Sequence, residues 1–98
     1  MESLFGNMVR ALRKDSGLMQ REVAAFLEID SPMLSNIERG ERKARREWIP
    51  KFAELFKADE DRLLTAWLAD KVQELIQGEN VAKDTIKVVA KNMGLSLK

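Results

Sequence analysis

Four side chains between residues 32 and 39 have the types and the spacing to bind the edges of nucleic-acid bases. The row consists of Pro32, Ser35, Asn36 and Arg39. These positions are i, i+3, i+4 and i+7, so one face of a helix would carry all four. Small hydroxyl and amide groups can approach base edges, and Arg39 can reach a phosphate. An ordinary solvated helix face has a similar composition, so the surrounding chain must decide between the two interpretations.

Two short helices joined by a tight turn are predicted to position this row. The first spans residues 20–27, the turn is residues 28–30, and the second spans residues 31–39. Apolar residues recur in both helices at the spacing of a face packed on one side. The positions predicted to face a common core are Val23, Ala24, Leu27, Leu34 and Ile37.

The ends of the second helix carry recognisable capping residues. Asp30 is a suitable N-cap, and Pro32 lies in the first turn, where a missing N–H costs nothing. Gly40 can end the helix in a left-handed conformation. These local signals favour a helix that begins at residue 31 and ends at residue 39.

Composition restricts the classes of protein to which the chain can belong. Its 98 residues are 45% hydrophobic and 34% charged, which predicts a small, soluble, globular protein. No apolar run approaches 18 residues, and no signal peptide is recognisable. Cysteine and histidine are both absent. The chain therefore lacks the commonest general base and metal ligand, and a cytoplasmic location is the simplest expectation.

The net charge of +1 hides an uneven distribution along the chain. Residues 39–46 carry five basic residues against one acid, residues 58–79 carry six acids against two basic residues, and residues 80–98 carry four lysines against one acid. A basic run is usually a solvated loop. This one directly follows the polar row, and local potential governs docking to a polyanion.

The rest of the chain is also predicted to be helical. Apolar residues recur with a helical period in four further segments, which are residues 3–16, 48–56, 60–77 and 81–93. Gly17 is expected to end the first of these helices, and Asn80 is expected to cap the last. No segment alternates with period two over a useful length, so no sheet is expected.

Motifs in four of these segments, in this order and at these spacings, resemble those of the Cro/lambda-repressor-like (Xre) helix-turn-helix family. The resemblance covers residues 5–66. It implies an all-α fold, with a five-helix lambda-repressor-like DNA-binding bundle at residues 1–66 and a C-terminal helical extension at residues 67–98. The motifs are Phe5-Gly6 with Leu12-Arg13, Gly17-Leu18-Met19-Gln20 with Val23-Ala24 and Leu27, Leu34 to Gly40, and Ala53 with Leu55-Phe56.

The resemblance also implies which residues contact double-stranded DNA. The helix at residues 31–39 would lie in the major groove, which displays a distinct pattern of donors and acceptors for each base pair. There Asn36 could pair bidentately with adenine, and Gln20 could bind a phosphate at a helix N-terminus. The implied base contacts are Ser31, Pro32, Met33, Ser35 and Asn36, and the implied phosphate contacts are Gln20, Arg39, Arg42, Lys43, Arg45 and Arg46.

A partly buried salt bridge between Arg13 and Glu38 is implied as well. Glu38 would then be structural and would face away from DNA, whose phosphates would repel its charge. Two unrelated surface charges are the alternative.

Three positions depart from the family pattern. Glu28 replaces the usual glycine of the turn, where a left-handed conformation costs a non-glycine residue roughly 1 kcal/mol, so the turn is expected to adjust. Pro32 can offer only apolar contact to a base. The loop after Gly40 has additional basic residues and no proline near Ala44, so the phosphate contacts there could shift by one position.

Residues 67–98 extend beyond the minimal domain of the family. One short reading helix makes few contacts, so a dimer on a symmetric site with half-sites about 34 Å apart is the usual solution. This segment has more apolar residues than a core of this size needs, and we expect them to form a dimer interface. Folding of the last helix back onto its own domain is the alternative. The expected interface residues are Trp67, Leu68, Val72, Leu75, Ile76, Ile86, Val89 and Met93.

The sequence therefore predicts a transcriptional regulator of bacterial or phage type that binds double-stranded DNA as a homodimer on a pseudo-palindromic operator. The alternative is an antitoxin or adaptor that mainly binds a protein partner through its C-terminal helices. An enzyme is not expected, because the acids fall mostly at helix starts and on exposed faces. No cofactor, metal, small-molecule ligand or membrane is expected as a partner.

Overall fold

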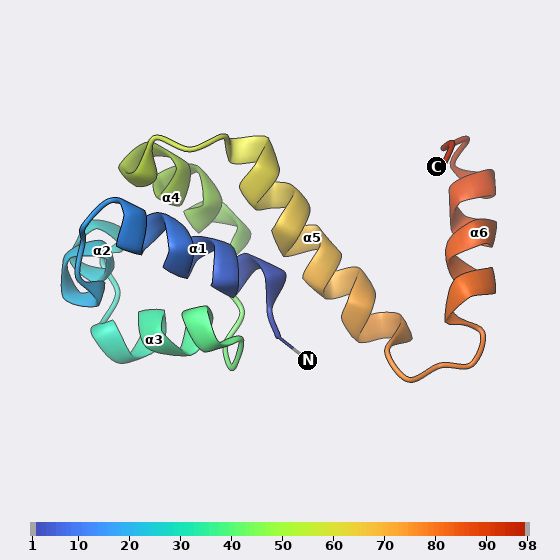
Figure 1. Cartoon of the computed structure of the whole chain (residues 1–98), viewed down its shortest axis with the longest axis horizontal. Helices are drawn as coiled ribbons and strands as arrows, with labels where there is room; N and C mark the ends of the chain where they lie inside the picture. The colour runs from blue at the N-terminus through green and yellow to red at the C-terminus, as the bar shows by residue number, and fades with distance from the viewer. Residues whose placement is uncertain (1, 98) are drawn as a thin grey trace.

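The protein is described here by a computed structural model that covers residues 2–97 (Figure 1). Its helices are α1 (Leu4–Asp15), α2 (Gln20–Leu27), α3 (Ser31–Arg39), α4 (Ile49–Phe56), α5 (Glu60–Ile76) and α6 (Ala82–Asn92), with a 3-10 turn, η1 (Arg46–Trp48), before α4. The described residues contain no strand, and the predicted all-α fold is confirmed. None of the helices within residues 2–97 is both long and apolar enough to cross a bilayer.

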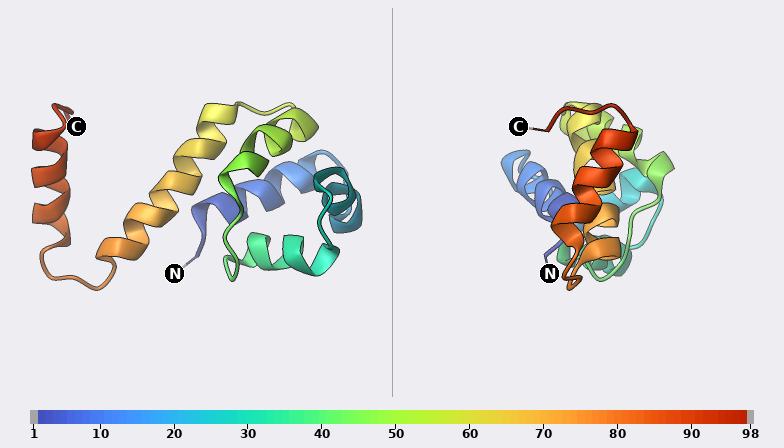
Figure 2. Two further views of the ribbon diagram at one scale, coloured as in Figure 1. Left: turned by 180° about the vertical axis from the view of Figure 1, so that it is seen from behind. Right: turned by 90° about the vertical axis from the view of Figure 1, so that its right-hand side faces the viewer.

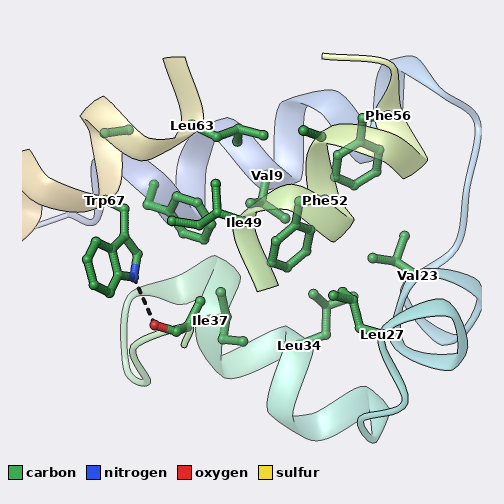
Figure 3. Close-up of a cluster of buried hydrophobic side chains, with 14 of the residues drawn as sticks. Val9, Val23, Leu27, Leu34, Ile37, Ile49, Phe52, Phe56, Leu63 and Trp67 are labelled. Carbon is green, nitrogen blue, oxygen red and sulfur yellow. Dashed lines mark hydrogen bonds between the residues drawn. The ribbon is translucent and has the colours of Figure 1, made fainter. Parts of the chain in front are cut away.

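Helices α1 to α4 and the first half of α5 surround one hydrophobic core (Figure 3). Phe52 lies at its centre, with its ring edge-on to Phe5 at 5.7 Å and stacked with Phe56 at 6.0 Å between centroids. The inner faces of α2 and α3 supply the predicted apolar positions. The fully buried side chains include Val9, Val23, Leu27, Leu34, Ile37, Ile49, Phe52 and Leu63. The core therefore fixes the backbone of α3 from beneath.

The N-terminus of α1 is tied to α5 by a single carboxylate. Asp70 accepts hydrogen bonds from the Ser3 hydroxyl at 2.7 Å, from the Leu4 amide at 2.8 Å and from the Phe5 amide at 3.1 Å. The Ser3 hydroxyl in turn accepts from the Gly6 amide at 2.8 Å. The first amides of α1 have no partner within their own helix, and Asp70 of α5, 66 positions after Leu4, accepts hydrogen bonds from two of them.

Helix α5 is continuous across residue 66, where the sequence suggested a domain boundary. Trp67 and Asp70 lie beyond that point and still pack on the bundle. The chain leaves the bundle at the end of α5, close to Gly78, which has a left-handed φ of 81°. Helix α6 then stands apart from the other helices, as Figure 1 and the left view of Figure 2 show. Residues 67–76 therefore continue the same helix that packs on the core, and the last helix does not fold back onto the core.

Several helix ends differ by one residue from the sequence-based expectations, among them both ends of α1 and of α6. Trp48 belongs to η1, and α4 begins one residue later at Ile49. Asn80 was expected to cap the last helix, but the N-cap of α6 is Val81, which offers no side-chain acceptor. The end of α5 lies at Ile76, one residue before the predicted end. Each of these ends differs by a single residue, which is the usual spread in the placement of helix boundaries.

Candidate nucleic-acid interface

The turn between α2 and α3 keeps its left-handed residue although no glycine is present. Glu28 has φ 61° and ψ 39°, and its N–H bonds back to the carbonyls of Ala24 and Ala25. The expected adjustment of the turn is therefore wrong, because Glu28 adopts the left-handed conformation itself. The burial of Leu27 before it and of Leu34 after it compensates for a strain of about 1 kcal/mol.

The predicted limits of α3 are confirmed at both ends. The Asp30 carboxylate accepts from the Met33 amide at 2.8 Å, so it caps the N-terminus. Gly40 has φ 78° at the C-terminus, and a Cβ there would lie 2.9 Å from the Cβ of Ser3. Both the left-handed backbone and the close approach of Ser3 therefore require glycine at this position.

The outer face of α3 is open, as the spacing predicted. Pro32 and Arg39 are exposed, while Ser31, Ser35 and Asn36 are half-buried. Met33 is half-buried and packs against the hydrophobic core, so only part of its side chain is accessible. The accessible polar groups of this helix are thus confined to one narrow row.

Arg39 lies along this row. Its Nε donates to both carboxylate oxygens of Glu41 at 3.2 Å, and its Nη2 donates to the Asn36 Oδ1 at 2.5 Å. Its Nη1 hydrogen-bonds the hydroxyl of Ser35. The guanidinium of Arg39 therefore sits among the candidate base-contacting side chains.

A buried polar cluster holds α1, α2 and α3 together on the inner side of α3. Glu38 receives the Arg13 Nε at 2.7 Å and Nη2 at 3.1 Å, so the ion pair suggested by the resemblance is present and bidentate. The side chain of Glu38 is only 3% exposed, and that of Arg13 is 13% exposed. Gln20 also donates its amide to Glu38 at 3.0 Å, so one of its donors serves this cluster and is not free for a phosphate.

Helix α1 approaches α3 closely at Gly6. A Cβ at this position would lie 2.4 Å from the carbonyl oxygen of Ile37 and 2.7 Å from that of Glu38. Such distances are well below van der Waals contact, so only glycine allows the two backbones to meet here. Gly6 and the Glu38 cluster together determine how closely α3 packs against α1.

The basic segment after Gly40 is exposed at four of its predicted phosphate contacts, which are Arg42, Lys43, Arg45 and Arg46. Three of these side chains also have intramolecular partners. Lys43 pairs with Glu74 of α5, Arg45 lies 3.8 Å from the carboxylate of Glu47, and the guanidinium of Arg46 is 6.0 Å from the ring centre of Trp67. Glu74 and Glu47 are exposed, and exposed ion pairs of this kind are weak enough for a phosphate to replace.

Trp67 anchors this segment to the bundle. Its indole N–H donates to the Ala44 carbonyl at 2.8 Å (Figure 3). The amino group of Lys71 lies 4.0 Å from the ring centre of Trp67. The residue is 9% exposed and belongs to the core. Its expected place in a dimer interface is therefore wrong, because the tryptophan is already used within one subunit.

The other expected interface residues remain accessible. Leu68, Val72 and Leu75 follow one another along α5 at spacings of four and three residues, and Leu75 is 79% exposed. A similar exposed row consists of Ile86 and Val89 of α6 and Met93, the C-cap of that helix. Ile76 is half-buried. The sequence did not single out Val88, Leu95 or Leu97, which are exposed as well.

Sequence reasoning missed three acids that position this region, Glu41, Asp70 and Glu74. Glu41 is only two residues from Arg39, so its proximity was a usable signal. Asp70 and Glu74 act on partners that lie 31 or more positions away, and no local pattern reports such pairing.

Comparison with protein families gives one match that covers most of the bundle. Residues 4–68 match the family described as helix-turn-helix domain. This range contains α1 to α4, the turn and the part of α5 that packs on the core. A comparison with curated protein sequences gave no match.

Solved structures of similar fold include two regulators. The restriction-modification controller protein C.AhdI from Aeromonas hydrophila is 30% identical, with a TM-score of 0.57; the alignment covers 62% of this chain and 88% of the controller. One structure of the clp gene regulator ClgR from Corynebacterium glutamicum is 24% identical, with a TM-score of 0.59, and covers 68% of this chain and 87% of its own.

A second structure of ClgR is 21% identical and extends the likeness in fold to 92% of this chain and 90% of its own, with a TM-score of 0.60. The family match and the fold agree with the buried ion pair, the capped α3 and the open polar row. The chain therefore belongs to the Cro/lambda-repressor-like (Xre) helix-turn-helix family of DNA-binding transcriptional regulators.

Proposed function

We propose that this protein regulates transcription by binding a pseudo-palindromic operator as a homodimer, with α3 of each subunit in a major groove. The observation that carries the proposal is the accessible polar row of α3 directly beside an exposed basic segment. The buried Arg13–Glu38 pair holds the first, and Trp67 anchors the second. A groove about 12 Å wide admits one helix, and its walls are phosphates that the basic segment can reach. The similarity to a restriction-modification controller and to a clp gene regulator supports the regulatory role.

Roles divide between the polar row and its surroundings. Ser31, Pro32, Ser35 and Asn36 are proposed to meet base edges, whereas Met33 could contribute only the part of its side chain that the core leaves free. Arg42, Lys43, Arg45 and Arg46 are proposed to bind phosphates. Gln20 keeps one amide N–H for a phosphate beside its bond to Glu38. The proposal keeps Glu38 away from DNA, in line with its burial.

The dimer is proposed to form through α5 and α6. The exposed rows Leu68–Val72–Leu75 and Ile86–Val89–Met93 have the alternating three- and four-residue spacing of helices that pack side by side. Exposed apolar surface of this kind is costly in water unless a partner covers it. Two reading helices about 34 Å apart would then match successive major grooves on one side of the duplex.

Binding to labelled duplexes selected from a random pool tests the DNA role. Affinity should fall with salt by about 0.9 log unit per log unit of salt for each phosphate neutralised. Arg46→Ala should weaken all duplexes equally, and Asn36→Ala should weaken the selected sequence by roughly 1–3 kcal/mol more than random DNA. Lys51→Ala is the control, since Lys51 is an exposed lysine of α4 outside the proposed phosphate contacts. A flat salt response, or no selected sequence, would contradict the proposal.

Sedimentation at micromolar concentration tests the dimer. The wild-type protein should sediment as a dimer, and Leu75→Lys should shift it toward the monomer by placing a charge in the interface. Met19→Lys introduces the same charge at an exposed apolar residue outside the proposed interface and should leave the dimer intact. A wild-type monomer would refute the homodimer.

A second function is favoured by one observation, the separation of α6 from its own bundle. An antitoxin or adaptor would use such a helix to bind a different protein. A monomer that binds DNA weakly and gains affinity with a partner protein would support this alternative, whereas a stable homodimer that covers α6 would oppose it.

A further inference from the structure

The hydrogen bonds of Arg39 determine what the reading face can offer to a base. Within residues 2–97, one N–H on each nitrogen of its guanidinium is engaged: Nε with Glu41, Nη1 with Ser35 and Nη2 with Asn36. A guanidinium has five N–H donors, so one remains on each terminal nitrogen. These two donors lie on the two terminal nitrogens of one planar group and are here called the fork.

Asn36 is limited by the same arrangement. Its Oδ1 accepts from Arg39 at 2.5 Å, whereas its amide nitrogen has no hydrogen-bond partner among the described residues. A bidentate pair with adenine needs that oxygen to accept from the adenine amino group. With the oxygen engaged, Asn36 presents its two N–H donors, and the hydroxyl hydrogen of Ser35 adds another donor. Ser35, Asn36 and Arg39 therefore form a cluster that mainly donates hydrogen bonds, here called the donor cluster.

The charge of Arg39 is balanced beside the donor cluster. Both carboxylate oxygens of Glu41 lie 3.2 Å from its Nε, and the two side chains are about equally exposed. A phosphate approaching Arg39 would also meet the negative charge of Glu41, which weakens its attraction. The edge of a base carries no net charge, so Glu41 imposes a smaller penalty on a base contact than on a phosphate contact.

Guanine is the base whose edge matches a set of donors. In the major groove it presents two adjacent acceptors, N7 and O6, whereas adenine and thymine each pair one acceptor with an amino or methyl group, and cytosine presents a donor. We propose that Arg39 reads a guanine in each half-site, that Asn36 supports it as a donor, and that Glu41 is a positioning residue that aims the guanidinium. This inference rests on the proposed DNA-binding function and replaces the expected phosphate contact of Arg39 and adenine contact of Asn36.

The test begins with the duplex selected by the wild-type full chain. Its half-sites should contain a guanine at which 7-deazaguanine, which lacks the N7 acceptor but still pairs with cytosine, weakens binding roughly tenfold. Arg39→Lys keeps the charge and loses the fork. It should reduce discrimination at that guanine roughly 5- to 150-fold while largely preserving affinity for random DNA.

Glu41→Gln separates positioning from charge. Removal of the carboxylate should raise affinity for random DNA, and, because the aim of Arg39 is lost, it should also lower the preference for the guanine. If Arg39 bound only a phosphate, Glu41→Gln would raise affinity for all duplexes with the preference unchanged. Glu47→Gln is the matched control, since it removes an exposed carboxylate paired with a different arginine, Arg45.

The outcomes distinguish this inference from the function on which it rests. A selected operator with no guanine sensitive to 7-deaza substitution would overturn the reading of guanine and leave the DNA-binding function intact. An equal loss of cognate and random binding in Arg39→Lys would have the same meaning. Failure to select any sequence would refute the sequence-specific function itself, and the role of Arg39 with it.

Discussion

Helices α3 and α6 are similar in length and in amphipathic pattern, but the apolar face of α3 is buried and that of α6 is exposed. The apolar residues of α3, Leu34 and Ile37, are completely covered by the core. On α6, Val88 is 67% exposed and Val89 is 50% exposed. An apolar period of 3.6 residues thus predicts that one face of a helix packs against something, but it does not identify the packing partner. For α3 the cover is its own bundle, and for α6 it is proposed to be a second copy of the chain.

The largest change in stability is expected from loss of the buried Arg13–Glu38 pair, which holds α3 on the bundle. Glu38→Ala leaves the guanidinium of Arg13 and the amide of Gln20 without their acceptor in a buried place, so the free energy of unfolding should fall by roughly 3–5 kcal/mol. Urea denaturation measures the change. Glu41→Ala removes an exposed carboxylate near the same helix end and should change stability by no more than about 0.5 kcal/mol. Equal effects of the two substitutions would contradict a structural role for Glu38.

A smaller loss is expected where α1 meets α3. Gly6→Ala places a methyl group against the carbonyl oxygens of Ile37 and Glu38, and the two helices must separate. The cost should exceed the gain in helix propensity and leave a net destabilisation of about 1–2 kcal/mol. Thermal unfolding of Gly6→Ala beside Asn7→Ala, an exposed neighbour in the same helix, checks this expectation. A Gly6→Ala protein as stable as the control would show that α3 can move without cost.

Loss of the cap between α5 and α1 is expected to cost about 1 kcal/mol. Asp70→Ala removes the acceptor of the Leu4 and Phe5 amides, which then rely on water. Glu74→Ala, one turn further along α5, removes only an exposed pair with Lys43 and should cost less. Denaturation of both variants in parallel measures the difference, and the reverse order of stability would refute the cap.

The smallest free energy is expected for the opening of α6 in the monomer. An 11-residue helix without a packed face is marginal in water, so its amides should exchange with little protection at low protein concentration. Formation of the dimer should protect them, whereas protection of α3 should change little with concentration. Hydrogen exchange at two concentrations measures this contrast. Strong protection of α6 in a dilute monomer would mean that it packs on its own bundle.

Much of the structure of α2 and α3 could be predicted, because the capping residues and apolar period that define these helices are local in sequence. Asp30 and Gly40 mark the ends of α3 within a few residues, and the apolar period of α2 and α3 fixes their inner faces. The pairing of Arg13 with Glu38 came from the family resemblance, since their separation of 25 residues leaves no local trace. The all-α fold followed from the absence of any period-two segment.

The errors lie where the outcome depends on tertiary contacts. Trp67 falls on the apolar row of α5, and only the position of the Ala44 carbonyl places it in the core instead of at an interface. Asp70 looks like a solvated acid until α1 is brought beside it. The left-handed Glu28 opposes its own propensity and is held by packing on both sides, which a single-residue rule cannot anticipate.

The hydrogen bond between Trp67 and the Ala44 carbonyl has a spectroscopic consequence. The chain has two tryptophans, and Trp48 is half-buried in η1 while Trp67 is buried in direct contact with the segment proposed to bind phosphates. A Trp48→Phe protein would therefore carry one intrinsic fluorophore whose emission depends on the backbone at Ala44. Such a protein would report movement of the basic segment without any attached dye.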